Sequence, residues 1–183
     1  MRVVAGSARG LRLDVPSGRD VRPTADRVRE ALFSSLGARV RGARVLDLFG
    51  GSGALGVEAL SRGAALAVIV ELQKRAAEVV AANLVRTGLA ERARLIRGDA
   101  LKVIPSLAAE RVVFDIVFLD PPYAGDLAAL SLAAVVEQGI LATGGIVVVE
   151  HDKRGAVAKP AGVVVASVKA YGDTALTYLT RPS

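Results

Sequence analysis

The sequence predicts an α/β domain built on a doubly wound parallel sheet, and three observations lead to this fold class. From about residue 44, short β-branched runs alternate with alanine-rich stretches of helical length. Several runs, such as VFLD and IVVVE, are almost entirely apolar, as in strands covered on both faces. The chain of 183 residues is also long enough to bury one such core. Strands that alternate with helices in this way form a parallel sheet with helical crossovers.

The expected elements follow one another in order. The predicted strands are Arg44–Phe49, Leu66–Glu71, Arg94–Arg97, Phe114–Leu119 and Gly145–Glu150. The predicted helices between them are Ala54–Arg62, Gln73–Thr87, Ala100–Ala109 and Leu127–Glu137. Two further β-rich runs, Val163–Tyr171 and Thr174–Thr180, are separated only by Gly172-Asp173, which indicates a hairpin. The parallel sheet is therefore expected to contain one antiparallel strand near its edge.

Residues 1–40 are predicted to form an appendage packed on the main domain, which spans residues 41–183. Within it, Val3-Val4 and Leu11–Val15 flank a turn-like segment and indicate a short hairpin. A helix is expected over Ala25–Leu36, with Thr24 as its N-cap and one apolar face.

The positive charge is concentrated at this end of the chain. Residues 1–44 contain ten arginines, no lysine and four acids, a net charge of +6 that equals the net charge of the whole chain. Arginine suits phosphate because its planar guanidinium makes bidentate contacts. The segment is thus predicted to bind nucleic acid, and a solvated charged face is the alternative.

The residue types that are absent exclude several kinds of chemistry. The chain has no cysteine, which rules out disulfides, thiolate zinc sites, iron–sulfur clusters and a cysteine nucleophile for methylation at pyrimidine C5. A single histidine rules out a multi-histidine metal site. No apolar run approaches about 18 residues without a charge, and the first residues lack the apolar region of a secretion signal. We expect a cytoplasmic protein that uses no metal and contacts no membrane.

A glycine-rich turn follows the first strand of the predicted sheet. The segment Asp47–Gly53 leads into the pattern G-x-G-x-x-G over Gly51–Gly56, and Glu71 follows Gly51 by twenty residues. This spacing is typical of sites that bind an adenosine, where the acid contacts the ribose hydroxyls. The pattern alone does not separate a nicotinamide enzyme from an adenosylmethionine enzyme, and a tight turn without a ligand is a further alternative.

Two aspartates favour adenosylmethionine. Asp47 lies inside the turn, where its carboxylate would repel a pyrophosphate but attract the cationic end of adenosylmethionine. Asp99 follows the third strand, at the edge where a doubly wound sheet binds ligands, and is placed to accept a hydrogen bond from the adenine amino group. Asp99 is equally suited to cap the helix that begins at Ala100, and both roles can hold together.

The segment Asp120-Pro121-Pro122-Tyr123 ends the fourth strand and carries the most specific chemistry. The exocyclic amine of a nucleobase is a poor nucleophile because its lone pair is delocalised into the ring. The Asp120 carboxylate and the Pro121 carbonyl can accept its two N–H bonds and aim the nitrogen at a methyl sulfonium. Tyr123 can stack on an extruded base. These four residues are therefore the predicted catalytic residues, with a rigid strand-end turn as the alternative.

His151 is the only histidine and follows the fifth strand. A structural role is favoured over a role in proton removal.

Taken together, these residues resemble the bacterial 16S ribosomal RNA guanine-N2 methyltransferases of the small subunit. The resemblance covers nearly the whole chain, and its segments are Val3–Gly6, Arg22–Glu30, Val45–Gly56, Glu58–Gly63 and Asp120–Tyr123. The Arg22–Glu30 stretch is the specific part, because the cofactor motifs recur in many methyltransferases. The chain departs from the family pattern at Gly50, where alanine is expected.

The resemblance implies a seven-stranded class I methyltransferase (Rossmann-like) fold, S-adenosylmethionine as the methyl donor, and N2-methylguanine in 16S ribosomal RNA as the product. It implies a monomer that acts on this RNA or on the assembling small ribosomal subunit. Arg9, Arg22 and Arg27 become candidate RNA contacts, whereas Arg29 is expected to pair with an acid of the core. The implied cofactor-binding residues are Asp47, Phe49, Gly51, Ser52, Gly53, Glu71, Leu72, Asp99 and Ala100.

Other functions fit parts of the pattern. A DNA adenine-N6 or protein-glutamine methyltransferase uses a related tetrad, although the basic segment argues against a protein substrate. A nicotinamide oxidoreductase would leave Asp120–Tyr123 unexplained. An RNA-binding assembly factor without catalysis is disfavoured by the intact tetrad.

Overall fold

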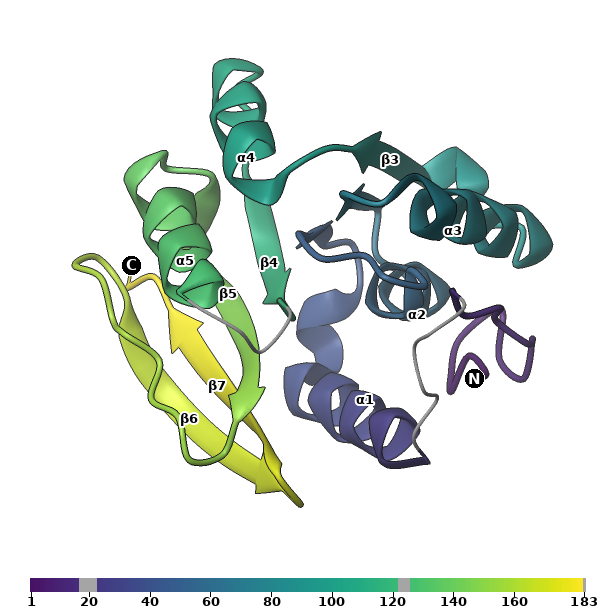
Figure 1. The fold of residues 1–183 in the computed structure, drawn as a ribbon, viewed down its shortest axis with the longest axis horizontal. Coiled ribbons are helices and arrows are strands. Elements are labelled where there is room, and N and C mark those ends of the chain that lie inside the picture. Colours follow the sequence, from purple (N-terminus) through teal and green to yellow (C-terminus); the bar gives the residue numbers. More distant parts are fainter. Residues whose placement is uncertain (17–22, 122–125, 183) are drawn as a thin grey trace.

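The computed structural model describes residues 1–16, 23–121 and 126–182, which form a seven-stranded sheet with helices on both faces (Figure 1). The strand order is β3-β2-β1-β4-β5-β7-β6. The strands are β1 (Arg44–Asp47), β2 (Leu66–Glu71), β3 (Ala93–Arg97), β4 (Phe114–Leu119), β5 (Leu141–Asp152), β6 (Val164–Tyr171) and β7 (Thr174–Thr180). The predicted fold class and all seven predicted strands are confirmed, with small shifts of their ends.

Strands β1 to β5 are parallel, and β7 lies antiparallel between β5 and β6. The predicted C-terminal hairpin is thus present, and it supplies the single reversal of direction next to the parallel strands. Strand β5 begins four residues earlier than predicted, at Leu141. The β4–β5 register shifts there, because Phe114 pairs with Leu141 and Ile116 pairs with Ile146. Gly144 lies in this additional part of the strand, and glycine is uncommon in strand interiors, so the sequence pattern did not indicate it.

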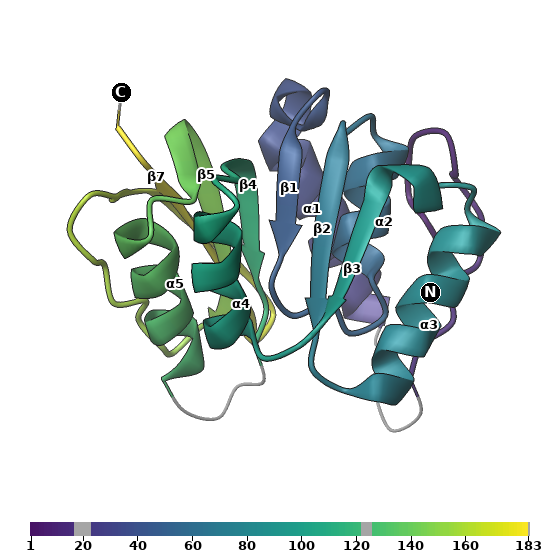
Figure 2. The same ribbon diagram turned by 90° about the horizontal axis from the view of Figure 1, so that it is seen from above.

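The helices are distributed over the two faces of the sheet (Figure 2). Helices α1 (Pro23–Leu36), α2 (Ala54–Ser61) and α3 (Lys74–Arg86) pack on one face, where their apolar residues join one core cluster. Helices α4 (Ala100–Ala109) and α5 (Leu127–Glu137) pack on the other face and join a second cluster. Two 3-10 helices, η1 (Gly37–Val40) and η2 (Ala90–Arg92), precede β1 and β3. Among the helices of the described ranges, none is both long and apolar enough to cross a membrane.

The N-terminal segment runs along the α2 side of the domain. Residues 1–13 form an irregular hairpin with one antiparallel bridge, Arg2 to Arg12, as the flanking apolar pairs predicted. Gly6 has a φ of +86°, and a Cβ there would lie 1.8 Å from the Ser61 carbonyl oxygen, so only glycine permits this approach to the end of α2. Val3 and Leu13 are buried in the same core cluster as α1 and α2. These two side chains therefore anchor the segment in that cluster.

Helix α1 begins at Pro23, two residues earlier than predicted. Thr24 therefore lies inside the helix, and the prediction that it forms the N-cap was wrong. The reason is that proline suits the first helical position, because its φ is already helical and it has no N–H to satisfy. The predicted apolar face is present, since Val28, Leu32 and Leu36 are all buried.

Candidate active site

A first cavity, of about 110 Å³, lies at the carboxyl ends of β1, β2 and β3. Five of the predicted cofactor-binding residues line it: Phe49, Glu71, Leu72, Asp99 and Ala100. They come from three separate segments, the turn after β1, the end of β2 and the start of α4. The cavity joins apolar walls with two carboxylates at the sheet edge where doubly wound folds bind ligands.

The glycine turn after β1 is held against β2. The Gly51 amide donates to Glu71 Oε2 at 2.7 Å, and the Gln73 amide donates to Glu71 Oε1, also at 2.7 Å. Glu71 is buried, and each of its oxygens keeps a lone pair that can accept a further hydrogen bond. Gly53 has a φ of +77° and stands directly before α2, so the turn reaches the helix through a conformation that favours glycine.

Gly50, where the resemblance led us to expect alanine, lies close to β2. A Cβ on Gly50 would come within 2.7 Å of Ile69 Cγ2. The glycine therefore fits the tight contact between this turn and β2.

Asp47 and Asp99 are both placed by their own backbone surroundings. Asp47 ends β1 and is 1% exposed, with its Oδ1 3.4 Å from the Phe49 amide. Asp99 is the N-cap of α4 and accepts hydrogen bonds from the Leu101 and Lys102 amides at 2.9 and 3.3 Å. The capping role of Asp99 is thus present, and its half-exposed carboxylate also faces the first cavity. Asp47 stands within the turn but does not line either of the two cavities described here.

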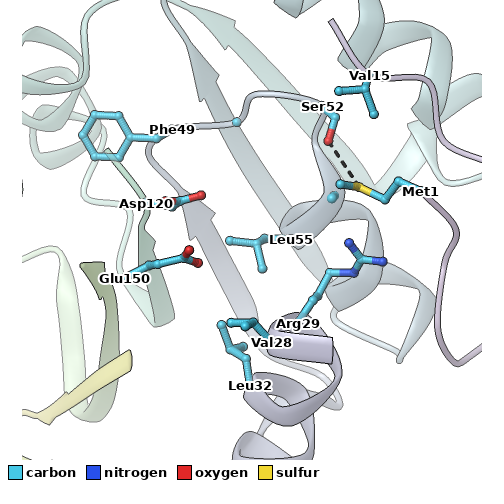
Figure 3. Close-up of a pocket in the computed structure, with 12 residues that line it drawn as sticks. Met1, Val15, Val28, Arg29, Leu32, Phe49, Ser52, Leu55, Asp120 and Glu150 are labelled. Atoms are coloured by element: carbon cyan, nitrogen blue, oxygen red, sulfur yellow. Dashed lines mark hydrogen bonds between the residues drawn. The ribbon is translucent and has the colours of Figure 1, made fainter. Parts of the chain in front are cut away.

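A second cavity, of about 210 Å³, opens next to the first on the side of the sheet covered by α1 and α2 (Figure 3). Asp120, directly after β4, and Glu150, two residues before the end of β5, both line it. Arg29 of α1 lies on the opposite wall, and apolar side chains, Leu55 among them, lie between these charges. Phe49 lines both cavities. Ser52 also lines the second cavity, and its hydroxyl lies 3.7 Å from Met1 Sδ.

Arg29 is held in this wall by a buried charge network. Its Nη2 contacts the Arg2 carbonyl oxygen at 2.5 Å and Asp26 Oδ1 at 3.1 Å, and its Nε lies 3.6 Å from Glu58 Oε2. Both Arg29 and Glu58 are almost fully buried, at 4% and 1% exposed. The prediction that Arg29 pairs with an acid of the core is confirmed.

The remaining predicted catalytic and RNA-binding residues lie partly inside and partly outside the described ranges. Pro121 is described and buried next to Asp120, whereas Pro122 and Tyr123 of the tetrad lie outside the described residues, as does Arg22. Arg27 is exposed on α1, directly before Val28 and Arg29, which line the second cavity.

Arg9 is placed elsewhere. The amides of its neighbours Ser7 and Ala8 donate hydrogen bonds to Ser61, the last residue of α2. Since α2 begins at the glycine turn and runs away from it, exposed Arg9 lies towards the edge of the sheet opposite the two cavities.

His151 is engaged by the C-terminal hairpin. Its Nδ1 lies 2.8 Å from the Asp152 carbonyl oxygen, and its Nε2 lies 2.8 Å from Thr177 Oγ1. These contacts fit the structural role favoured for His151.

Within the described ranges, no group of three or more histidine, aspartate or glutamate side chains is arranged to hold a metal ion.

Two features of the second cavity were not predicted from the sequence. One is the presence of Glu150, and the other is the position of Arg29 in the cavity wall. A signal for Glu150 was available, because the run IVVVE ends in an acid at the same sheet edge as the run that ends in Asp120. The role of Arg29 had no such signal, because it depends on how α1 packs across the sheet.

The strand order, the antiparallel β7 and the cavities at the carboxyl edge define a protein with the class I methyltransferase fold. The chain belongs to the family described as conserved hypothetical protein 95, whose model matches residues 1–180. It is 37% identical over 175 residues to YlbH of Bacillus subtilis, a candidate rRNA methyltransferase, covering 95% of each chain. It is 38% identical over 152 residues to ribosomal RNA small subunit methyltransferase D of Escherichia coli, covering 83% of this chain and 75% of that one.

A solved structure agrees with these relatives. A candidate methyltransferase of Escherichia coli, yhhF, superposes with a TM-score of 0.87 at 36% identity, covering 100% of this chain and 98% of that one. The family resemblance and the fold predicted from the sequence are thereby confirmed.

Proposed function

We propose that this chain is an S-adenosylmethionine-dependent methyltransferase that methylates the exocyclic N2 of a guanine in 16S ribosomal RNA by direct in-line transfer. The observation that carries the proposal is the meeting of two cavities at Phe49. One cavity has the residues expected for an adenosine, and the other holds the carboxylate expected for the target amine. A methyl group carried on the cofactor would therefore face an amine bound by Asp120.

The described residues fit the cofactor. Glu71 would accept hydrogen bonds from the ribose hydroxyls and Asp99 from the adenine amino group, while Phe49 and Leu72 would contact the adenine ring. The amino-acid end of the cofactor would extend along the glycine turn towards Ser52. There its carboxylate would meet the positive end of α2 and the Arg29 guanidinium, which balances the nearby acids.

When bound, adenosylmethionine supplies an electrophilic methyl group on a sulfonium. Asp120 would accept one N–H of the guanine amine and the Pro121 carbonyl the other, which localises the nitrogen lone pair and orients it in line with the methyl carbon. As the C–N bond forms, the methyl–sulfur bond breaks and its electron pair stays on sulfur. The proton lost from the nitrogen would pass to the Asp120 carboxylate and then to water.

Ribosomal RNA as the substrate is supported by the relatives, which are named for small-subunit and rRNA methylation, and by the placement of charge. The arginine-rich first segment would contact RNA phosphates, and its Arg9 and Arg27 are exposed. The RNA-binding role of this segment, the cytoplasmic location of the protein and its monomeric state all stay predictions.

The role of Asp120 can be tested by replacing it with alanine. We expect methyl transfer to ribosomal RNA to fall by about 100-fold or more, because the amine loses its main acceptor. Cofactor affinity, measured by isothermal titration, should change little, because Asp120 does not line the first cavity. The matched control is Asp115→Ala, at the opposite end of β4, where Asp115 accepts from the Arg44 amide. An active Asp120→Ala variant would show that the catalytic assignment is wrong.

The choice of cofactor is tested by the same titration on the unmodified protein. We expect binding of S-adenosylmethionine and none of NAD. Binding of NAD alone would instead identify a nicotinamide enzyme.

A further inference from the structure

Two carboxylates stand side by side in the second cavity, on neighbouring strands. Phe118 of β4 pairs with Val148 of β5, and Leu119 pairs with Val149, so the next positions in this register are Asp120 and Glu150. Both side chains point into the cavity from the same face of the sheet (Figure 3). Of these two acids, only Asp120 belongs to the predicted catalytic residues.

The direction of both side chains follows from strand alternation. Successive side chains of a strand point to opposite faces. Phe118 and Val148 belong to the core cluster under α1, α2 and α3, whereas Leu119 and Val149 belong to the cluster under α4 and α5. Two residues beyond Phe118 and Val148, the acids return to the α1 face, where the second cavity lies.

A pair of adjacent carboxylates matches one particular nucleobase edge. Beside its exocyclic amine, guanine carries the ring N1–H, a second donor. Adenine and cytosine carry an unprotonated ring nitrogen at the corresponding place, which is an acceptor. An ionised carboxylate can only accept hydrogen bonds. A second carboxylate next to Asp120 would therefore bind guanine and disfavour adenine and cytosine.

We propose that Glu150 selects guanine by accepting a hydrogen bond from its N1–H, while Asp120 holds the N2 amine. The inference rests on the proposed function and adds to it the residue that determines the base. One correct base-edge contact changes discrimination by about 10- to 100-fold.

Glu150 lies where a ligand can reach its carboxylate. Glu150 is only half-buried and lines two cavities, the second one and another lined by Pro121 and α5 residues. A partly exposed carboxylate that lines two cavities is suited to bind a ligand.

The test uses RNA segments that contain the target nucleotide as guanine, 2,6-diaminopurine or 2-aminopurine. Both analogues keep the 2-amino group and lack N1–H, but they differ at C6, so together they isolate the effect of N1. For the wild-type protein we expect kcat/KM to fall at least 10-fold on both analogues. Affinity for the same RNAs, measured with S-adenosylhomocysteine present, should fall in parallel, which gives a readout apart from activity.

The decisive variant is Glu150→Gln, because a glutamine amide can turn its N–H towards an unprotonated N1. We expect the preference for guanine over the analogues to fall to within about 3-fold of unity. Glu150→Asp keeps a carboxylate and should keep the preference at a lower rate. Glu137→Gln, on the exposed end of α5, is the matched control and should leave the preference unchanged.

Each outcome separates the inference from the proposed function. If wild type methylates guanine N2 but accepts both analogues equally, or if Glu150→Gln keeps the wild-type preference, Glu150 does not select the base and the proposed function stands. If wild type methylates adenine or cytosine, the proposed function fails and the inference fails with it. If Glu150→Gln does not fold, the wild-type and Glu150→Asp preferences decide, and loss of preference in Glu150→Asp would contradict the proposal.

Discussion

Among single residues, Glu58 links the N-terminal segment to the candidate site. It accepts hydrogen bonds from the Val4 and Ala5 amides at 2.8 and 3.0 Å and from Arg62 Nε at 2.7 Å. It also faces Arg29 Nε at 3.6 Å. A carboxylate buried to this degree is tolerated only because its oxygens are surrounded by donors. Through Glu58, the wall of the second cavity depends on how residues 4 and 5 are held.

Replacing Glu58 with glutamine should destabilise the protein. The amide leaves the buried Arg29 guanidinium with only the partly exposed Asp26 as a negative partner and turns an N–H towards other donors, so the free energy of unfolding should fall by about 3 kcal/mol. Urea unfolding monitored by circular dichroism measures this change. The control is Glu78→Gln, in the exposed Lys74–Glu78 pair, which should change stability by less than about 0.5 kcal/mol. Equal effects of the two substitutions would contradict the structural role given to Glu58.

The sequence predicted the identity of most acids of the site better than their contacts. Spacing indicated Glu71 and Asp99, because glycine turns and strand ends recur at regular distances along the chain. It could not show that Glu71 holds the amides of Gly51 and Gln73, which needs side-chain geometry. Glu150 was overlooked because its proximity to Asp120 follows from the β4–β5 register, which is a long-range property.

At the level of elements, α3 fastens the N-terminal segment to the glycine turn. Asn83 is fully buried, accepts from the Asp14 amide at 2.9 Å, and donates to the carbonyls of Asp14 and Ser52 at 2.9 and 2.8 Å. One turn further along α3, Arg86 forms an ion pair with the Asp14 side chain and lowers the pKa of that carboxyl below its ordinary value. The turn expected to bind the cofactor is therefore braced by a helix that lines neither cavity.

Changing Asn83 to leucine should affect both stability and ligand binding. Three hydrogen bonds are lost and the buried Ser52 carbonyl remains without a partner, so we expect a loss of roughly 2 to 4 kcal/mol in unfolding free energy. Adenosylmethionine affinity should also weaken, because the Ser52 carbonyl is no longer held. Thermal unfolding and isothermal titration measure the two effects. The exposed C-cap residue of α5, Gln138, offers a control, since Gln138→Leu should alter neither quantity. Unchanged binding by Asn83→Leu would show that these hydrogen bonds are unimportant for the turn.

The order and type of the helices and strands could be predicted from local sequence patterns. The contacts of the N-terminal segment with the core could not. Periodicity predicted the strands and helices almost to their ends, because each depends on nearby residues. The hydrogen bonds of Asp14 to Asn83 and of Ala5 to Glu58 join positions far apart in the sequence, and no local sequence pattern indicates them. The segment treated as an appendage therefore also braces the glycine turn and the wall of the second cavity.

Across the whole molecule, only part of the excess positive charge lies near the candidate site. The cavities lie at the carboxyl edge of the sheet, while the excess charge belongs to residues 1–44, whose last three arginines (39, 41 and 44) follow α1 and lead into β1. Arg27 is next to cavity-lining residues, and Arg9 lies towards the opposite edge. An RNA that contacts both must span the face formed by the N-terminal segment, so the proposed substrate would be a folded RNA and not a single nucleotide.

The contribution of this face can be measured with charge reversals. Arg9→Glu combined with Arg27→Glu should weaken RNA binding and make log Kd less dependent on log salt. Loss of two phosphate contacts lowers the slope by roughly 1.4 to 1.8, because each contact releases about 0.7 to 0.9 counterions. Filter binding at several salt concentrations gives this slope. Arg111→Glu makes a charge reversal at the end of α4, before β4 and far from the cavities, and should leave the slope unchanged. Testing the two arginines separately with a short RNA hairpin adds a spatial readout, since an RNA seated at the cavities reaches Arg27 but not Arg9. If the double variant retains the wild-type slope, the arginine-rich segment does not bind RNA and its charge only solvates the surface.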